Sequence, residues 1–134
     1  MSDGVPNFHV AVEREEDVLS LLGAVRLFAK TRNLSPLAAS RLLTVASELG
    51  TNLAKYATHG VVTGGFRSSD QRKIFLRAED KGPGIADLAA AMRDHYSTGG
   101  SMGVGLPGIK RLSDRFEIES ECGRGTRVLL EIHL

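Results

Sequence analysis

The sequence is poor in aromatic residues and in cysteine. Its 134 residues include no tryptophan, two tyrosines, five phenylalanines and one cysteine. The single cysteine, Cys122, cannot form an internal disulfide, which excludes a disulfide-stapled scaffold and leads us to expect a cytoplasmic protein. The four histidines are scattered, without the spacing that metal ligands need. A metal site built from His and Cys is therefore not expected.

Long hydrophobic runs and an excess of one charge are also missing. No apolar stretch approaches the roughly 18 residues of a membrane span, and the N-terminus resembles no secretion signal. The net charge of +1 gives no electrostatic reason to bind nucleic acid or an anionic membrane. The composition, 42% hydrophobic and 25% charged, is that of a globular protein. We expect a single domain over residues 1–134, with a flexible tail over residues 1–6.

The apolar pattern predicts pairs of strands alternating with pairs of helices. Helices are expected over residues 17–32, 36–57, 85–92 and 104–113, and strands over 8–12, 61–66, 73–80, 116–121 and 126–134. Ser35 followed by Pro36 is a typical helix start. Because paired strands dominate, the sequence predicts an α+β two-layer sandwich, with a mixed, mostly antiparallel sheet and helices on one face.

A row of polar side chains follows the second predicted helix. Glu48, Asn52 and Lys55 have the spacing i, i+4, i+7, so they project in one line beside the apolar arc of the helix. Asn is a poor residue inside a helix because its side chain competes for backbone hydrogen bonds. Gly50 is also unfavourable there, but it allows another group to pack closely. Taken alone, the row is equally typical of a solvated helix face.

A strand that ends in Asp-x-Gly-x-Gly suggests a binding pocket. The strand delivers Asp80, and Gly82 and Gly84 open the turn behind it. A carboxylate fixed at a strand end accepts a hydrogen bond from an exocyclic amine, and glycines let a flat ring lie against the backbone. Adenine meets both conditions, whereas guanine presents an oxygen at that ring position. The alternative is an ordinary turn, in which Asp and Gly are common.

The stretch YSTGGSMGVGLPG, residues 96–108, is rich in glycine and precedes a predicted helix. Gly103, Gly105 and Gly108 spell G-x-G-x-x-G, but the dinucleotide fingerprint must follow a strand, which is not predicted here. A glycine-rich backbone that leads into a helix presents free N–H groups to an anion. A triphosphate is the obvious candidate, and residues 97–102 are then expected to form a lid over it.

Together, these motifs resemble those of the GHKL (Bergerat-fold) ATPase superfamily. ELGTNLAKYA is similar to its N box, EDKGPGI to its G1 box and GVGLPG to its G2 box. GRGT, at residues 123–126, resembles its late Gly-Thr motif. The resemblance extends from about Phe8 to Leu134.

Within this superfamily, the anti-sigma-factor serine kinase branch fits best. The run YSTGGSMGVGLPGIKRL resembles the switch serine/threonine kinases of bacterial stress signalling, the RsbT type. Gyrase-like relatives carry an Asp at the position of Lys55. The resemblance thus implies an ATP-dependent protein serine/threonine kinase with a histidine-kinase-like ATPase fold.

The resemblance also implies a role for each matching residue. Asp80 holds the adenine amine, assisted through water by Thr126, while Gly82 and Gly84 line the base. Asn52 coordinates Mg²⁺, and Lys55 contacts a phosphate. The backbone around the G2 box cradles the phosphates, namely Gly103, Val104, Gly105 and Leu106.

Glu48 is the implied catalytic residue, which orients the attacking hydroxyl and accepts its proton. The implied substrate is a Ser or Thr of a STAS-domain antagonist protein. The kinase then switches between this antagonist and a downstream output, such as a phosphatase or a sigma factor. Two alternatives share the same pocket: a nucleotide-gated binding module with little kinase activity, and an anti-sigma factor that binds a sigma factor directly.

Overall fold

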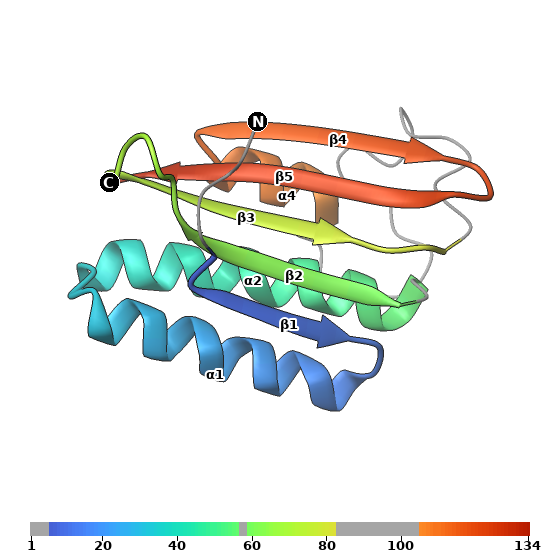
Figure 1. Ribbon diagram of the computed structural model, residues 1–134, viewed down its shortest axis with the longest axis horizontal. Helices are drawn as coiled ribbons and strands as arrows, with labels where there is room; N and C mark the ends of the chain where they lie inside the picture. Colours follow the sequence, from blue (N-terminus) through green and yellow to red (C-terminus); the bar gives the residue numbers. More distant parts are fainter. Residues whose placement is uncertain (1–5, 57–58, 83–104) are drawn as a thin grey trace.

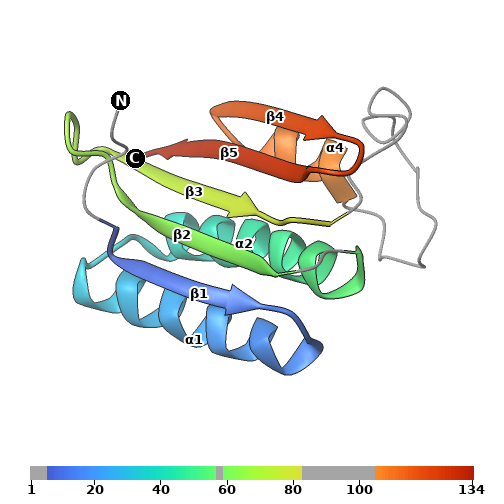
Figure 2. The same ribbon diagram turned by 45° about the vertical axis from the view of Figure 1, so that its right-hand side comes forward.

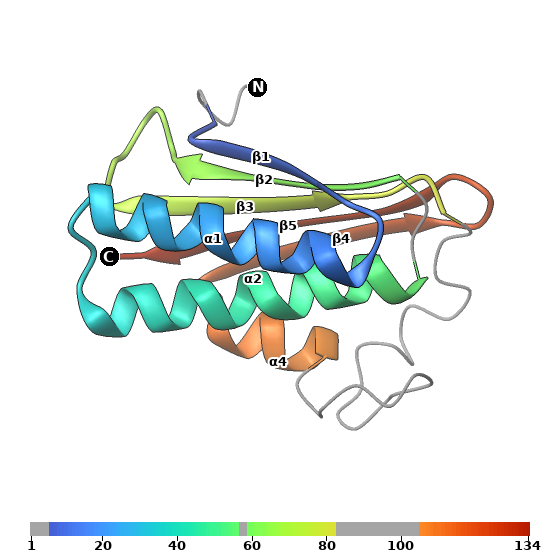
Figure 3. The same cartoon turned by 90° about the horizontal axis from the view of Figure 1, so that it is seen from below.

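A computed structural model describes residues 6–56, 59–82 and 105–134. One five-stranded sheet has its described helices on a single face (Figure 1 and Figure 3). The α+β two-layer architecture expected from the sequence is confirmed. In chain order, the elements are β1 Phe8–Val12, α1 Glu15–Thr31, α2 Pro36–Tyr56, β2 Gly60–Phe66, β3 Lys73–Glu79, α4 Gly105–Leu112, β4 Arg115–Glu121 and β5 Gly125–His133.

The strands follow the order β1-β2-β3-β5-β4, and every described pairing is antiparallel. The sequence predicted a mixed, mostly antiparallel sheet, so the parallel component is not found among the described strands. Pairing of β3 with β5 places Glu79 opposite Arg127. The end of β3 therefore lies beside the start of β5, although about 50 residues of chain separate the two.

The boundaries of the elements agree with the sequence pattern to within two residues at each end. Ser35 caps α2 as expected, since its Oγ accepts a hydrogen bond of 3.1 Å from the backbone N–H of Ala38. The expected helix over residues 85–92 and most of the glycine-rich stretch lie outside the described residues.

The core lies between the sheet and the helices. The apolar arc predicted for α2 is confirmed for the side chains that the structure describes, all of which are buried against the sheet. Alternate residues of the central strands meet them from the other layer. The most buried members of this core include Leu21, Val25, Leu42, Val45, Leu49, Val62, Ile74, Leu76, Leu130 and Ile132.

Helix α2 lies between α1 and α4 (Figure 3). Gly50 marks the side that faces α1, because a Cβ there would lie only 3.0 Å from Cδ2 of Leu21. Close packing at Gly50, expected from the sequence, is thus confirmed. On the opposite side, Arg41 donates a hydrogen bond of 2.5 Å from Nε to the carbonyl of Leu112 at the end of α4.

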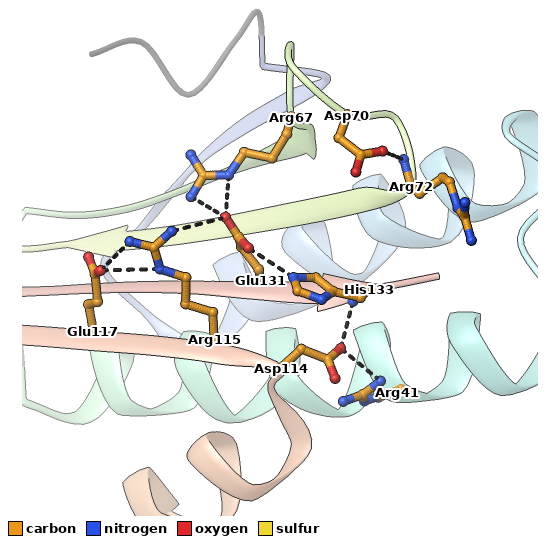
Figure 4. A network of polar contacts seen from close by, with 9 residues as sticks. All are labelled: Arg41, Arg67, Asp70, Arg72, Asp114, Arg115, Glu117, Glu131 and His133. Atoms are coloured by element: carbon orange, nitrogen blue, oxygen red, sulfur yellow. Dashed lines mark hydrogen bonds and ion pairs between the residues drawn. The ribbon is translucent and has the colours of Figure 1, made fainter.

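The sheet face that bears no helix carries a polar network around a buried carboxylate (Figure 4). Glu131 of β5 is only 4% exposed. Its Oε2 accepts a 2.7 Å hydrogen bond from Nε of Arg67 and forms an ion pair with Nη2 of the same side chain at 2.6 Å. Its Oε1 lies 2.9 Å from Nε2 of His133. Burial acts to raise the pKa of Glu131, but these hydrogen bonds and the charges of Arg67 and Arg115 outweigh it and lower the pKa.

A second carboxylate extends this network toward the helices (Figure 4). Oδ2 of Asp114 accepts a 2.6 Å hydrogen bond from the backbone N–H of His133, which lowers the pKa of Asp114. The same oxygen lies 3.3 Å from Nη1 of Arg41. Arg41 therefore ties α2 both to the end of α4 and to the segment that leads into β4.

Replacing Glu131 with Gln is expected to lower the free energy of unfolding by about 3 kcal/mol at pH 7, because it breaks a buried ion pair. A carboxyl whose folded pKa is lowered stabilises the fold above its unfolded pKa, and that contribution is lost as the pH falls through the folded pKa. The difference between wild type and Glu131→Gln should therefore be largest near neutral pH and shrink below about pH 4. Urea titrations of both proteins at several pH values measure this difference in the free energy of unfolding.

The matched control is Glu119→Gln, whose side chain is 76% exposed and 3.4 Å from Arg127. An exposed pair of this kind contributes at most about 1 kcal/mol. Equal stability of the two variants at pH 7 would contradict the structural role of Glu131.

Candidate functional site

The polar row expected on the second helix lies along one side of α2. Glu48 and Asn52 are half-buried, and Lys55 is exposed in the last turn. Arg41, which contacts α4, precedes Glu48 by seven residues, or two helical turns. Glu48 and its row therefore lie toward the α4 side of α2.

Asp80 directly follows β3 and is held at both its backbone and its side chain. Its N–H donates a 3.0 Å hydrogen bond to the carbonyl of Thr126 on β5. Its Oδ1 accepts a 2.7 Å hydrogen bond from the N–H of Gly82, which is buried. Within the described part of the chain, Oδ2 accepts no hydrogen bond. The turn thus fixes the position of the Asp80 carboxylate.

Thr126 of β5, which accepts the Asp80 N–H, is itself held by a side-chain contact with β4. Oγ1 of Thr126 lies 2.8 Å from Oγ of Ser120, so the two hydroxyl groups share a hydrogen bond. Sequence reasoning selected Thr126 but missed Ser120. Only the pairing register, which sets Ser120 opposite Thr126, reveals the contact.

Gly125 begins β5 at the closest approach to Asp80. Its φ of +107° is one that side chains rarely adopt, and a Cβ there would clash with the backbone carbonyl of Asp80. The late Gly-Thr motif therefore packs directly against the strand end that carries the candidate adenine ligand.

Gly125→Ala is expected to destabilise the fold by more than 2 kcal/mol, because it adds a steric clash to an unfavourable backbone conformation. Gly123→Ala is the matched control in the same turn. Gly123 also has a positive φ, +83°, but a Cβ there would meet nothing within 4 Å. Gly123→Ala should lower the free energy of unfolding only through its unfavourable backbone conformation, by about 1 kcal/mol. Urea unfolding of both variants compares them, and equal losses would mean that the contact with Asp80 imposes no constraint.

Helix α4 carries the described end of the G2 box. It begins at Gly105, whose φ is +53°, and Leu106 is half-buried against the core. Its last turn is held by Arg41, as described above. The other predicted residues of the glycine motifs, Gly84, Gly103 and Val104, lie outside the described residues.

Three elements that carry described site residues end at the same end of the molecule (Figure 2). The C-terminal end of α2, the end of β3 and the β4–β5 turn all lie there, and α4 packs beside α2. Among the described residues, no three His, Cys, Asp or Glu side chains are arranged to hold a metal ion. A cation at this end would take an oxygen from an amide such as that of Asn52, together with oxygens of its ligand.

The sequence of the chain matches a known protein family. The sequence profile of the histidine kinase-, DNA gyrase B- and HSP90-like ATPases matches residues 38–134. The chain belongs to this ATPase family. The family expected from the N, G1 and G2 boxes is thus confirmed, and membership implies that the protein uses ATP.

A curated relative indicates which kind of protein within the family this chain resembles. The chain is 38% identical over 121 residues to the serine/threonine-protein kinase RsbT of Bacillus subtilis strain 168. The match covers 89% of this chain and 90% of the relative. The expectation of a protein serine/threonine kinase of the switch type is confirmed.

Solved structures share the fold at low sequence identity. The RsbU and RsbW domains of Rv1364c from Mycobacterium tuberculosis superpose with a TM-score of 0.69 at 16% identity. That match covers 98% of this chain but only 32% of the solved chain. Full-length ShkA in complex with AMPPNP gives a TM-score of 0.56 at 23% identity, over 82% of this chain and 29% of the other.

Proposed function

We propose that this kinase transfers the γ-phosphoryl group of MgATP to a serine or threonine of a STAS-domain antagonist, and that this transfer switches its binding partner. The observation that supports the proposal is that the end of β3, where Asp80 is fixed, and the C-terminal end of α2, which carries the polar row, lie at the same end of the molecule. One group suits an adenine, and the other suits phosphates and an attacking hydroxyl.

The adenine half of the site is built around Asp80. The Gly82 N–H occupies one carboxylate oxygen, so the other accepts the exocyclic amine of the base. Gly82 and Gly84 present a backbone without side chains to the ring. Thr126 assists through a water molecule, and Ser120 holds the Thr126 hydroxyl in place.

The phosphate half of the site is built around α2 and the start of α4. Asn52 supplies an amide oxygen, a ligand type that Mg²⁺ accepts. Lys55 contacts a phosphate, and the backbone N–H groups of Gly103, Val104, Gly105 and Leu106 cradle the others. Bound Mg²⁺ supplies neutralisation of the phosphate charge, which phosphoryl transfer requires.

Glu48 serves the acceptor hydroxyl. It lies one turn before Asn52 on the same side of α2, next to the expected phosphates, and it has no ion-pair partner among the described residues. The hydroxyl oxygen bonds to the γ-phosphorus while the bond to the β–γ bridging oxygen breaks, which releases ADP. Glu48 orients this hydroxyl and accepts its proton.

No described helix is long and apolar enough to cross a membrane. We place the kinase in the cytoplasm, with its antagonist and with a downstream output such as a phosphatase or a sigma factor.

A transfer assay tests the proposal. The purified chain is incubated with MgATP labelled at the γ-phosphate and with each STAS-domain protein of the same genome, and the phosphorylated residue is mapped by mass spectrometry. We expect one STAS-domain protein to be labelled on Ser or Thr, and no labelling from MgGTP. Release of a partner that needs ATP but yields no phosphoprotein would instead favour a nucleotide-gated binding module. A stable complex with a sigma factor would favour a direct anti-sigma role.

A further inference from the structure

A shallow depression crosses the outer surface of α2, on the side of the helix that faces away from the sheet. It measures about 290 Å³ and receives side chains from both α1 and α2. Its lining consists of Leu22, Arg26, Leu43, Thr44, Ser47 and Glu48. The proposed catalytic carboxylate is therefore also a wall of this surface hollow.

The depression reaches Glu48 from the α1 side of α2. Leu43 and Gly50 are seven residues apart, so they share one side of α2, and Gly50 faces Leu21 of α1. Glu48 lies on the other side of the same helix, toward α4. The hollow thus runs over α2 from α1 to Glu48, and a group lying in it reaches Glu48 from the α1 side.

The hollow holds two opposite charges that do not pair. Arg26 is exposed on α1, and neither Arg26 nor Glu48 forms an ion pair with the other or with a further described residue. An exposed arginine by itself is ordinary. An arginine that shares one hollow with a carboxylate presents a cation and a hydrogen-bond acceptor on the same surface.

Apolar surface lies between and beside these charges. Leu22 and Leu43 are half-buried in the lining. Leu19, one helical turn before Leu22, is 71% exposed and extends this surface along α1. The complementary ligand therefore carries a hydroxyl for Glu48, a carboxylate for Arg26 and an apolar side chain between them.

We propose that this hollow is the docking surface for the protein substrate, resting on the proposed kinase function. The acceptor Ser or Thr reaches Glu48 while an acidic side chain on the same surface of the substrate pairs with Arg26. The hollow crosses α2, and a helix is about 10 Å across. We therefore expect the hydroxyl that reaches Glu48 and the carboxylate that pairs with Arg26 to be about 10 Å apart on the substrate. Arg26 acts as a specificity residue and touches neither the nucleotide nor the reacting atoms.

Charge reversal at Arg26 tests this docking surface. With the STAS-domain protein that wild type phosphorylates, Arg26→Glu is expected to raise KM for that protein at least 10-fold and to leave kcat at saturating substrate within about threefold. Lys30→Glu is the matched control, because Lys30 is exposed one turn further along α1 and outside the hollow. It should leave KM within about twofold.

A reciprocal substitution sharpens the test. Replacing the substrate carboxylate that lies about 10 Å from the acceptor hydroxyl with Lys should restore KM for Arg26→Glu and impair transfer by wild type. An unchanged KM in Arg26→Glu, with normal transfer by wild type, overturns the docking surface alone. Loss of MgATP binding by Arg26→Glu, or a change in its oligomeric state, also overturns it, because Arg26 then serves the nucleotide site or a contact between copies. Failure of wild type to phosphorylate any STAS-domain protein overturns the kinase proposal and the docking surface together.

Discussion

Replacing Asp80 with Asn is expected to weaken MgATP binding by at least 100-fold. The carboxylate accepts the Gly82 N–H at one oxygen and offers the other to the adenine amine. An Asn side chain has only one oxygen, so it either releases Gly82 or turns its own NH₂ group toward the amine of the base. Both outcomes remove a charge-assisted hydrogen bond from the pocket. Calorimetric titration of MgATP into both proteins measures the change, with MgGTP as the nucleotide control.

The control for this variant is Asp70→Asn, which makes the same chemical change far from the site. Asp70 lies in the β2–β3 connection, where its Oδ1 accepts a 2.9 Å hydrogen bond from the backbone N–H of Arg72 (Figure 4). It should bind MgATP as wild type does. If Asp80→Asn is folded and binds MgATP with unchanged affinity, the adenine pocket is not at Asp80.

Glu48→Gln is expected to lower kcat for phosphoryl transfer by a factor of about 10² to 10⁴. Gln has nearly the same shape as Glu, so the acceptor hydroxyl still fits, but the amide cannot take its proton. The dissociation constant of MgATP should change by less than about threefold, because adenine and phosphates are held by other residues. Transfer to the STAS-domain substrate is followed with labelled ATP, and nucleotide binding by calorimetry.

The control for Glu48 is Glu15→Gln, an exposed position in the first turn of α1. It should leave both kcat and ATP binding essentially unchanged. Normal transfer by Glu48→Gln would remove the assigned role of Glu48 as proton acceptor. Loss of ATP binding by that variant would move Glu48 into the nucleotide site itself.

Much of the candidate site was predictable because its signals are local. The row of Glu48, Asn52 and Lys55 follows from helical spacing, and the buried arc beside it was found where the apolar period placed it. Asp80 and Gly82 were recognised from a turn pattern at the end of a strand. Patterns of this kind depend on residues within one or two turns of each other, so a sequence displays them directly.

Contacts between distant segments were not predictable. Nothing in the sequence pairs Ser120 with Thr126, since the pairing depends on the register of β4 against β5. In the sequence, Glu131 looks like an ordinary polar residue of a strand with alternating polar and apolar positions, and nothing indicates that it is buried. Its partner Arg67 is 64 residues away, in the connection after β2.

The sequence by itself determined the family, the elements and the residues that carry the proposed chemistry. Tertiary structure decided which side of α2 faces α4, that β5 lies between β3 and β4, and that a hollow containing Arg26 ends at Glu48. The physical reason is the range of the interactions. Hydrophobic periodicity and turn chemistry act along the chain, whereas strand order, helix packing and pairing of charges are set by burial between segments that only the folded chain brings together.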